Sequence, residues 1–218
     1  MNGGVYVFLG PPASGKGTQA ELLKDRIKLP HIALGDILRE AVREGTAFGL
    51  EAKKHMEQGK LVPDELVISI ASARFRKPDC KAGFIVDGYP RTLKQQKALE
   101  DDLKALGLDL KAVIYINISV ETAISRLSGR RSCKNCGAVY HVKFNPPKVN
   151  NVCDKCGAEL YQRKDDTEEV IKTRFSVYNK ETVPLVEYFK KSGKIIEVNG
   201  SPTVEDVKKT IFSSLKLE

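Results

Sequence analysis

The chain has 218 residues, which is enough for one sizeable core with small insertions and too few for two full domains. Hydrophobic residues make up 41% and charged residues 29%, a balance that excludes an intrinsically disordered chain. The formal charge of +8 favours an anionic partner: nucleic acid, a membrane surface or a phosphorylated small molecule.

Location and redox state follow from what the sequence lacks and from its cysteines. No run approaches the roughly 18 apolar residues that a membrane span needs. The N-terminal stretch MNGGVYVFLG has no basic region of the kind that opens a secretory signal. Four of the five cysteines form Cys-x-x-Cys pairs, which in a reducing compartment indicate metal binding rather than disulfides. We therefore expect a cytoplasmic protein.

Short runs rich in β-branched and aromatic residues predict the strands. They are nearly continuous rather than alternating, as in strands that are buried on both faces. The runs are VYVFL at 5–9, GFIVD at 83–87, AVIYINI at 112–118 and KIIEV at 194–198, with a weaker candidate, IAL, at 32–34.

Helical patterns lie between these strands. They cover residues 16–28, 63–76, 93–106 and 121–128. Because strands and helices alternate, the sequence predicts an α/β fold with a doubly wound parallel sheet.

Two segments interrupt this alternation. Residues 35–62 predict two short helices broken at Gly45 and Gly49. The second segment, at about 129–166, contains the paired cysteines and many turn residues. After it, Asp166 and Glu169 resemble a capped helix start, which opens a long amphipathic pattern over 168–191.

A phosphate-binding loop is predicted directly after the first strand. Residues 10–18 read GPPASGKGT and match the spacing G-x-x-x-x-G-K between a strand and a helix. In such a loop the backbone N–H groups and the helix N-terminus face phosphate oxygens, and the lysine, here Lys16, reaches the β and γ phosphates. Gly17 follows the lysine, so the hydroxyl of Thr18 comes one residue later than in the common G-K-[ST] form.

The stretch DGYPRT at 87–92 adds a second phosphate-related feature. Asp87 ends a predicted strand, and open α/β sheets bind ligands at the carboxyl ends of their strands. A carboxylate there can orient Mg²⁺ through water, and Arg91 can hold a phosphate through two hydrogen bonds.

Arginines and cysteines characterise the second interrupting segment. Arg126 and Arg130 precede the cysteine pairs and Arg163 and Arg174 follow them, so guanidinium groups from both borders can converge on a phosphoryl group, although a solvated helix face is the alternative for each. Sixteen residues separate the two cysteine pairs, the spacing of a four-thiolate structural site for Zn²⁺ or iron. The ligands are Cys133, Cys136, Cys153 and Cys156. The same pattern occurs in nucleic-acid-binding zinc ribbons.

Taken together, GKGT at 15–18, HIALGDILR at 31–39 and DGYPRT at 87–92 resemble the adenylate kinases and related nucleoside monophosphate kinases. The resemblance runs in order from about residue 5 to residue 200. It implies reversible transfer of the γ-phosphoryl group of Mg-ATP to AMP, giving two ADP, in adenine nucleotide homeostasis. It also implies a monomer whose partners are ATP, AMP and ADP, with neither nucleic acid nor membrane.

The resemblance further implies an organisation in three parts and a cofactor. Residues 1–32, 63–128 and 167–218 form the core, 33–62 form the excursion that binds the nucleoside monophosphate, and 129–166 form a lid over ATP. In some bacterial adenylate kinases this lid carries a structural Zn²⁺ on four cysteines.

Residue roles carry over from the resemblance position by position. The implied catalytic residues are Lys16, Asp87, Arg91, Arg130, Arg163 and Arg174. The implied ATP contacts are Ala13, Ser14, Gly15, Lys16, Gly17, Thr18, Arg126, Arg130, Tyr140, His141 and the carbonyl of Pro202. The implied AMP contacts are Leu34, Arg39, Lys60, Leu61, Val62, Gly88, Arg91, Gln95, Arg163 and Arg174.

Two positions depart from the family pattern. Ala13 replaces the usual glycine, which matters if that backbone needs a positive φ. Leu34 replaces the usual threonine, and loss of its hydroxyl near the acceptor base can weaken base selection by about 1 to 3 kcal/mol. A pyrimidine monophosphate kinase is therefore an alternative, although Gln95 matches the amide that pairs with adenine.

An alternative from another class is a zinc-ribbon nucleic-acid-binding protein switched by a nucleotide. Its cysteine loop would need stacking platforms among clustered basic residues. The loop has two aromatic residues, Tyr140 and Phe144, but is only modestly basic. This composition favours the kinase.

Overall fold

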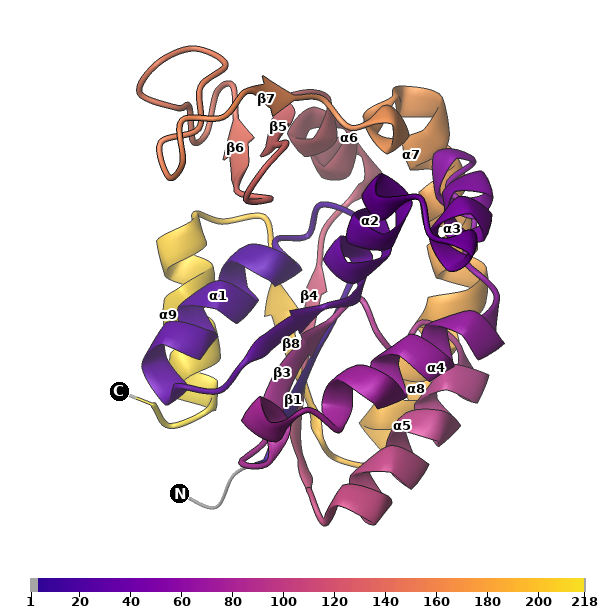
Figure 1. Ribbon diagram of the computed structural model, residues 1–218. Helices are drawn as coiled ribbons and strands as arrows, with labels where there is room; N and C mark the ends of the chain where they lie inside the picture. Colours follow the sequence, from indigo (N-terminus) through magenta and orange to yellow (C-terminus); the bar gives the residue numbers. More distant parts are fainter. Residues whose placement is uncertain (1–3, 218) are drawn as a thin grey trace.

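A five-stranded parallel sheet forms the centre of the protein (Figure 1). The computed structural model describes residues 4–217. The strand order is β2-β3-β1-β4-β8, and all five predicted strands are confirmed. Their bounds are β1 Val5–Leu9, β2 His31–Ala33, β3 Phe84–Asp87, β4 Leu110–Asn117 and β8 Ile195–Asn199.

Helices cover both faces of the sheet, as the doubly wound prediction requires. On one face, α1 (Lys16–Ile27) and α9 (Val204–Ser214) pack on strand residues such as Phe8 and Ile114. On the other face, residues such as Val7 pack against α4 (Asp64–Phe75), α5 (Leu93–Leu106) and α8 (Val183–Lys191). Because both faces are covered, the strands need the continuous apolar runs seen in the sequence.

The first excursion contains α2 (Leu34–Glu44) and α3 (Ala47–Glu57). The predicted break at Gly45 is confirmed, since Gly45 caps α2 in the left-handed region. The predicted break at Gly49 is wrong, because Gly49 lies inside α3 and donates its N–H to the capping hydroxyl of Thr46. A Cβ at Gly49 would lie 2.0 Å from the Ala41 carbonyl oxygen, so this glycine allows the two helices to approach closely.

The cysteine-containing segment folds as a separate three-stranded antiparallel sheet with the order β6-β5-β7. Its strands are β5 (Arg130–Cys133), β6 (Val139–His141) and β7 (Leu160–Tyr161). Its small core consists of Cys133, Tyr140, Cys153 and Leu160. Strands this short give no period in the sequence, which is why they were not predicted.

The long helical pattern over 168–191 is divided in the structure. It contains α7 (Glu168–Val177), a π-helical turn, η3 (Tyr178–Thr182), and α8. Pro184 has no N–H to continue an α-helical ladder and sits at the start of α8. The helix α6 (Val120–Ser128) packs beside α7 in a cluster of its own.

The predicted cap at Asp166 is wrong. Asp166 lies in a 3₁₀ turn, η2 (Lys164–Asp166), and Thr167 is the residue that precedes α7. The Asp166 carboxylate instead pairs with arginines of the site described below. The remaining elements are another 3₁₀ turn, η1 (Pro78–Cys80), and α9, neither of which was predicted. Among residues 4–217, every helix is too short or too polar to cross a bilayer.

Candidate active site

The loop between β1 and α1 has the geometry of a phosphate-binding loop. Gly15 precedes the first turn of α1 with φ 96°, and Ser14 is buried in the loop. The N-terminus of α1, which begins at Lys16, therefore carries the partial positive charge that favours phosphate. Ala13 has φ 61°, a left-handed conformation that is unfavourable for alanine by about 1 to 2 kcal/mol. The departure noted at this position thus has a conformational cost.

Lys16 lies inside this loop. Its Nζ donates to the carbonyl oxygens of Gly10 at 2.9 Å and Pro11 at 2.8 Å. Desolvation lowers the pKa of Lys16 to about 8, and the nearby Asp87 carboxylate opposes that shift. The ammonium group is therefore held among carbonyl oxygens, a weakly solvated position from which phosphate oxygens can attract it.

Asp87 lies at the carboxyl end of β3, against the start of α1. A Cβ built on Gly17 would be 3.3 Å from the Asp87 Oδ2 atom. A serine or threonine at this position would place its side chain against the carboxylate. The unusual Gly17 therefore leaves room for Asp87 beside the phosphate loop.

Three of the predicted arginines lie near the half-buried Asp165 and the buried Asp166, for which the sequence predicted no pairing with arginine. Arg130 donates through Nε to Asp166 Oδ2 at 2.8 Å, and its Nη2 also bonds this carboxylate. Arg174 contacts Asp165 at 2.9 Å and Asp166 at 3.6 Å. Arg163 donates to Ser132 Oγ at 2.8 Å.

The electrostatic state of this cluster follows from burial. Desolvation, together with neighbouring arginines, lowers the pKa values of Arg163 and Arg174 to about 10. Both groups therefore remain charged at neutral pH and concentrate positive charge where an anionic phosphoryl group can be stabilised. The available sequence signal was the acidic pair Asp165 and Asp166, which begins two residues after Arg163 and precedes Arg174.

A cavity of about 130 Å³ connects the phosphate loop with the first excursion. Asp165, Met56, Val67 and Tyr178 also line it, which the sequence did not indicate. Arg163 lies outside its lining, although its side chain is only 9% exposed. The cavity collects Lys16 and nine of the ten predicted AMP contacts: Leu34, Arg39, Lys60, Leu61, Val62, Gly88, Arg91, Gln95 and Arg174.

The acceptor-side arginines are held by the protein. Arg91 donates through Nε to the Gly88 carbonyl oxygen at 2.8 Å, and burial lowers its pKa. Arg39 pairs with Asp36 at 2.5 Å. Together with Arg174, which pairs with Asp165, the cavity thus has three restrained guanidinium groups, and its apolar walls include the buried Leu34.

Arg126 connects the phosphate loop to the loop after β8. It donates to the carbonyl oxygens of Ala13, Gly200 and Ser201. Pro202 follows directly and is exposed. Arg126 therefore places the predicted adenine contact of ATP beside the phosphate loop.

The two lid residues predicted to contact ATP lie in different environments. Tyr140 is 7% exposed, accepts from the Asp154 N–H and bonds the Cys153 sulfur, which favours a structural role over nucleotide contact. His141 accepts at Nδ1 from Lys143 and packs its ring 4.4 Å from that of Phe144. The ATP contact of His141 stays a prediction.

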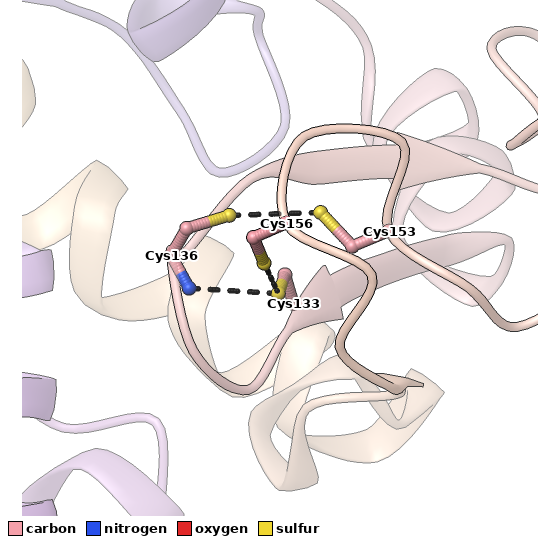
Figure 2. Close-up of side chains that lie close together, drawn as sticks. All are labelled: Cys133, Cys136, Cys153 and Cys156. Atoms are coloured by element: carbon pink, nitrogen blue, oxygen red, sulfur yellow. Dashed lines mark hydrogen bonds between the residues drawn. The ribbon is translucent and has the colours of Figure 1, made fainter.

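The four paired cysteines converge at one end of the small sheet (Figure 2). Their sulfur atoms all lie within 4.8 Å of one another, and the pairs Cys133–Cys156 and Cys136–Cys153 are 3.5 and 3.6 Å apart. Four thiolates at about 2.3 Å from a tetrahedral metal are about 3.8 Å apart. The cluster is therefore compatible with a bound metal ion.

The two excursions touch each other. Arg43 of α2 donates to the Lys134 carbonyl oxygen at 3.2 Å, and Lys164 pairs with Glu57 of α3 at 3.3 Å. Arg163 also approaches Asp36 at 3.9 Å. These contacts bring the cysteine-containing segment and the first excursion together beside the arginine cluster.

A phosphate loop, a carboxylate at the neighbouring strand end and clustered arginines on a parallel sheet define a P-loop phosphotransferase that acts on nucleotides. The profile of the family described as adenylate kinase matches residues 8–194. Similar proteins include an adenylate kinase of Archaeoglobus fulgidus, 49% identical over 96% of this chain and 97% of its own. Those of Methanocella arvoryzae and Caldicellulosiruptor bescii are 47% and 48% identical, each over 97% of this chain and 98% and 99% of their own.

The chain therefore belongs to the adenylate kinase family, and the resemblance found in its motifs is confirmed. Membership makes it a nucleotide-binding kinase, which uses ATP together with Mg²⁺. It favours AMP as the acceptor over the pyrimidine and nucleic-acid alternatives.

Proposed function

We propose that this chain transfers the γ-phosphoryl group of Mg-ATP reversibly to AMP, giving two ADP, and so serves adenine nucleotide homeostasis. The observation that carries the proposal is one cavity lined by both Lys16 of the phosphate loop and the arginines Arg39, Arg91 and Arg174. A donor phosphate at the loop and an acceptor phosphate at these arginines would then meet in line.

The chemistry needs positioning and charge neutralisation rather than a general base. The second pKa of a phosphate monoester is about 6, so the attacking oxygen of AMP is already anionic near neutral pH. Lys16 and the loop N–H groups hold the ATP phosphates, and Arg130, Arg163 and Arg174 stabilise the charge of the phosphoryl group in transfer. Asp87 would hold Mg²⁺ through water, and the metal would neutralise charge on the phosphates of ATP.

Closure of the two excursions would exclude water, which otherwise hydrolyses ATP. The contacts of Arg43 with Lys134 and of Lys164 with Glu57 support this role. We accordingly propose a core of residues 1–32, 63–128 and 167–218, an acceptor-binding part at 33–62 and a lid at 129–166.

The four-cysteine cluster is proposed to hold a structural Zn²⁺. Four thiolates complete the coordination of zinc, so the metal would fold the lid and take no substrate. A segment whose core has only four buried residues needs such a constraint. The cysteines are free thiols rather than disulfides, which fits a reducing compartment, and we propose a cytoplasmic monomer.

A second acceptor class has one observation in its favour, which is the buried Leu34 in the cavity wall in place of a hydroxyl. The test is phosphoryl transfer from Mg-ATP to AMP, CMP, UMP, GMP and water, followed by separation of the nucleotides. ADP formation that requires AMP would support the proposal. Preferred transfer to a pyrimidine nucleotide would change the acceptor, and hydrolysis alone would overturn the kinase assignment.

A further inference from the structure

The amide of Gln95 is held by the protein on both of its ends. Its Nε2 donates to Asp64 Oδ1 at 2.8 Å, and its Oε1 accepts from the Arg91 backbone N–H at 2.8 Å. Gln95 is 1% exposed and lines the acceptor cavity. Each end therefore has a fixed partner before any nucleotide binds.

Asp64 is itself fixed. It is the first residue of α4, where the helix N-terminus favours a negative charge. Both of its oxygens accept from the Thr92 hydroxyl at 3.1 Å, and the same hydroxyl caps α5 by accepting from the Gln95 N–H at 3.2 Å. Asp64, Thr92 and Gln95 thus form one hydrogen-bonded unit at the junction of α4 and α5.

These two partners permit only one orientation of the amide. A carboxylate accepts hydrogen bonds and a backbone N–H donates them. Rotating the Gln95 amide by half a turn would place its oxygen against the Asp64 oxygen and its NH₂ against the Arg91 N–H. Both contacts would become repulsive in a buried position, where unsatisfied polar groups are most costly.

The fixed amide has a defined capacity for a base. An amide offers two N–H groups and two lone pairs, of which one each is occupied here, so one donor and one acceptor remain. Adenine presents the complementary amino donor and ring-nitrogen acceptor on its pairing edge. Hypoxanthine and guanine present the reverse, a carbonyl acceptor and a ring N–H donor.

We propose that Asp64 is a specificity-determining positioning residue, which fixes the Gln95 amide so that the acceptor site takes 6-amino purines and rejects 6-keto purines. The inference rests on the proposed function, in which Gln95 meets the acceptor base. Because Leu34 supplies no hydroxyl to the same cavity, discrimination depends more strongly on this amide. The same polarity applies to pyrimidines, so CMP is preferred to UMP as a minor acceptor.

The test compares AMP with IMP, which differ in this edge and have nearly the same shape. The variant Asp64→Asn can either accept from or donate to the Gln95 amide, so it removes one of the two constraints on rotation. We expect the ratio of kcat/KM for AMP to kcat/KM for IMP to fall at least tenfold in Asp64→Asn, with the KM for ATP unchanged. Asp64→Ser, whose hydroxyl also donates and accepts, gives the same test should Asp64→Asn not fold.

Glu65→Gln is the matched control. Glu65 is the next residue in the first turn of α4 and pairs with Lys94 on the surface, so its substitution removes the same helix-terminal charge without touching Gln95. The control should keep the wild-type ratio. If Asp64→Asn lowers transfer to AMP and IMP by the same factor, Asp64 has only a structural role and the inference is overturned. If the wild-type enzyme transfers nothing to AMP, the proposed function itself fails.

Discussion

In the free enzyme, Asp166 is expected to balance the positive charge of the arginine cluster. During catalysis the phosphate groups of the nucleotides are expected to balance part of the same charge. Its carboxylate is fully buried and pairs with Arg130 and Arg174. Replacing it in Asp166→Asn keeps the size of the side chain and removes the charge. Arg130 then lacks its counter-ion in the free enzyme, and Arg174 keeps only Asp165.

The magnitude follows from this burial. Removing one partner of a buried ion pair costs about 3 to 5 kcal/mol, because the remaining charge is uncompensated. For a chain of this size each kcal/mol lowers the melting temperature by about 2 to 4 °C, so the expected loss is about 6 to 20 °C. With saturating Mg²⁺ and ADP, phosphate oxygens should replace part of the missing charge, and the loss should shrink by at least half.

Thermal or urea unfolding of both proteins, with and without Mg²⁺ and ADP, measures this difference. The surface variant Glu168→Gln, which loses only an exposed pair with Lys172, should cost less than about 1 kcal/mol and serves as the control. An equal loss for Asp166→Asn in the free and the liganded enzyme would refute the reasoning. It would mean that Asp166 supports packing rather than the phosphate-binding arginines.

Three further predictions concern the lid, the lysine and the phosphate loop. Removal of zinc with a chelator should clearly lower the melting temperature, whereas the activity per folded molecule should change less. An unchanged melting temperature would contradict a structural metal. Because burial lowers the pKa of Lys16 to about 8, kcat/KM for ATP should fall about tenfold per pH unit above pH 8 in a stopped assay, and a flat profile to pH 10 would argue against the shift. The sign for stability is opposite: the unfolded state binds that proton more tightly, so Lys16 makes the free enzyme more stable as pH rises from about 8 to 10.5, by about 3 kcal/mol in all. Ala13→Gly removes a left-handed alanine but loosens the unfolded chain, so urea unfolding should show a net gain of about 0 to 1 kcal/mol, and a loss above about 1 kcal/mol would show that the Ala13 methyl packs strongly.

Local patterns were enough to predict the sheet, the phosphate loop and the cysteine cluster, because each depends on residues that are close together in the chain. Strands buried on both faces must be continuously apolar, as VYVFL at 5–9 is. The loop at 10–16 requires fixed spacing between its glycines and Lys16. Each Cys-x-x-Cys pair likewise brings two sulfur atoms together within four residues, so spacing alone predicted the four-cysteine cluster that the structure shows.

The partners of buried polar groups that lie far apart in the chain could be identified only in the assembled fold. Asp166 looked like a helix cap, but it pairs with Arg130 across 36 positions. Gly49 was predicted to break a helix, but it lies inside α3, where the absence of a side chain allows close contact with the backbone of Ala41. The Asp64 carboxylate reaches Gln95 across 31 positions and fixes its amide. The sign and partner of a buried charge depend on which elements pack together, and this is a property of the assembled fold rather than of any local stretch.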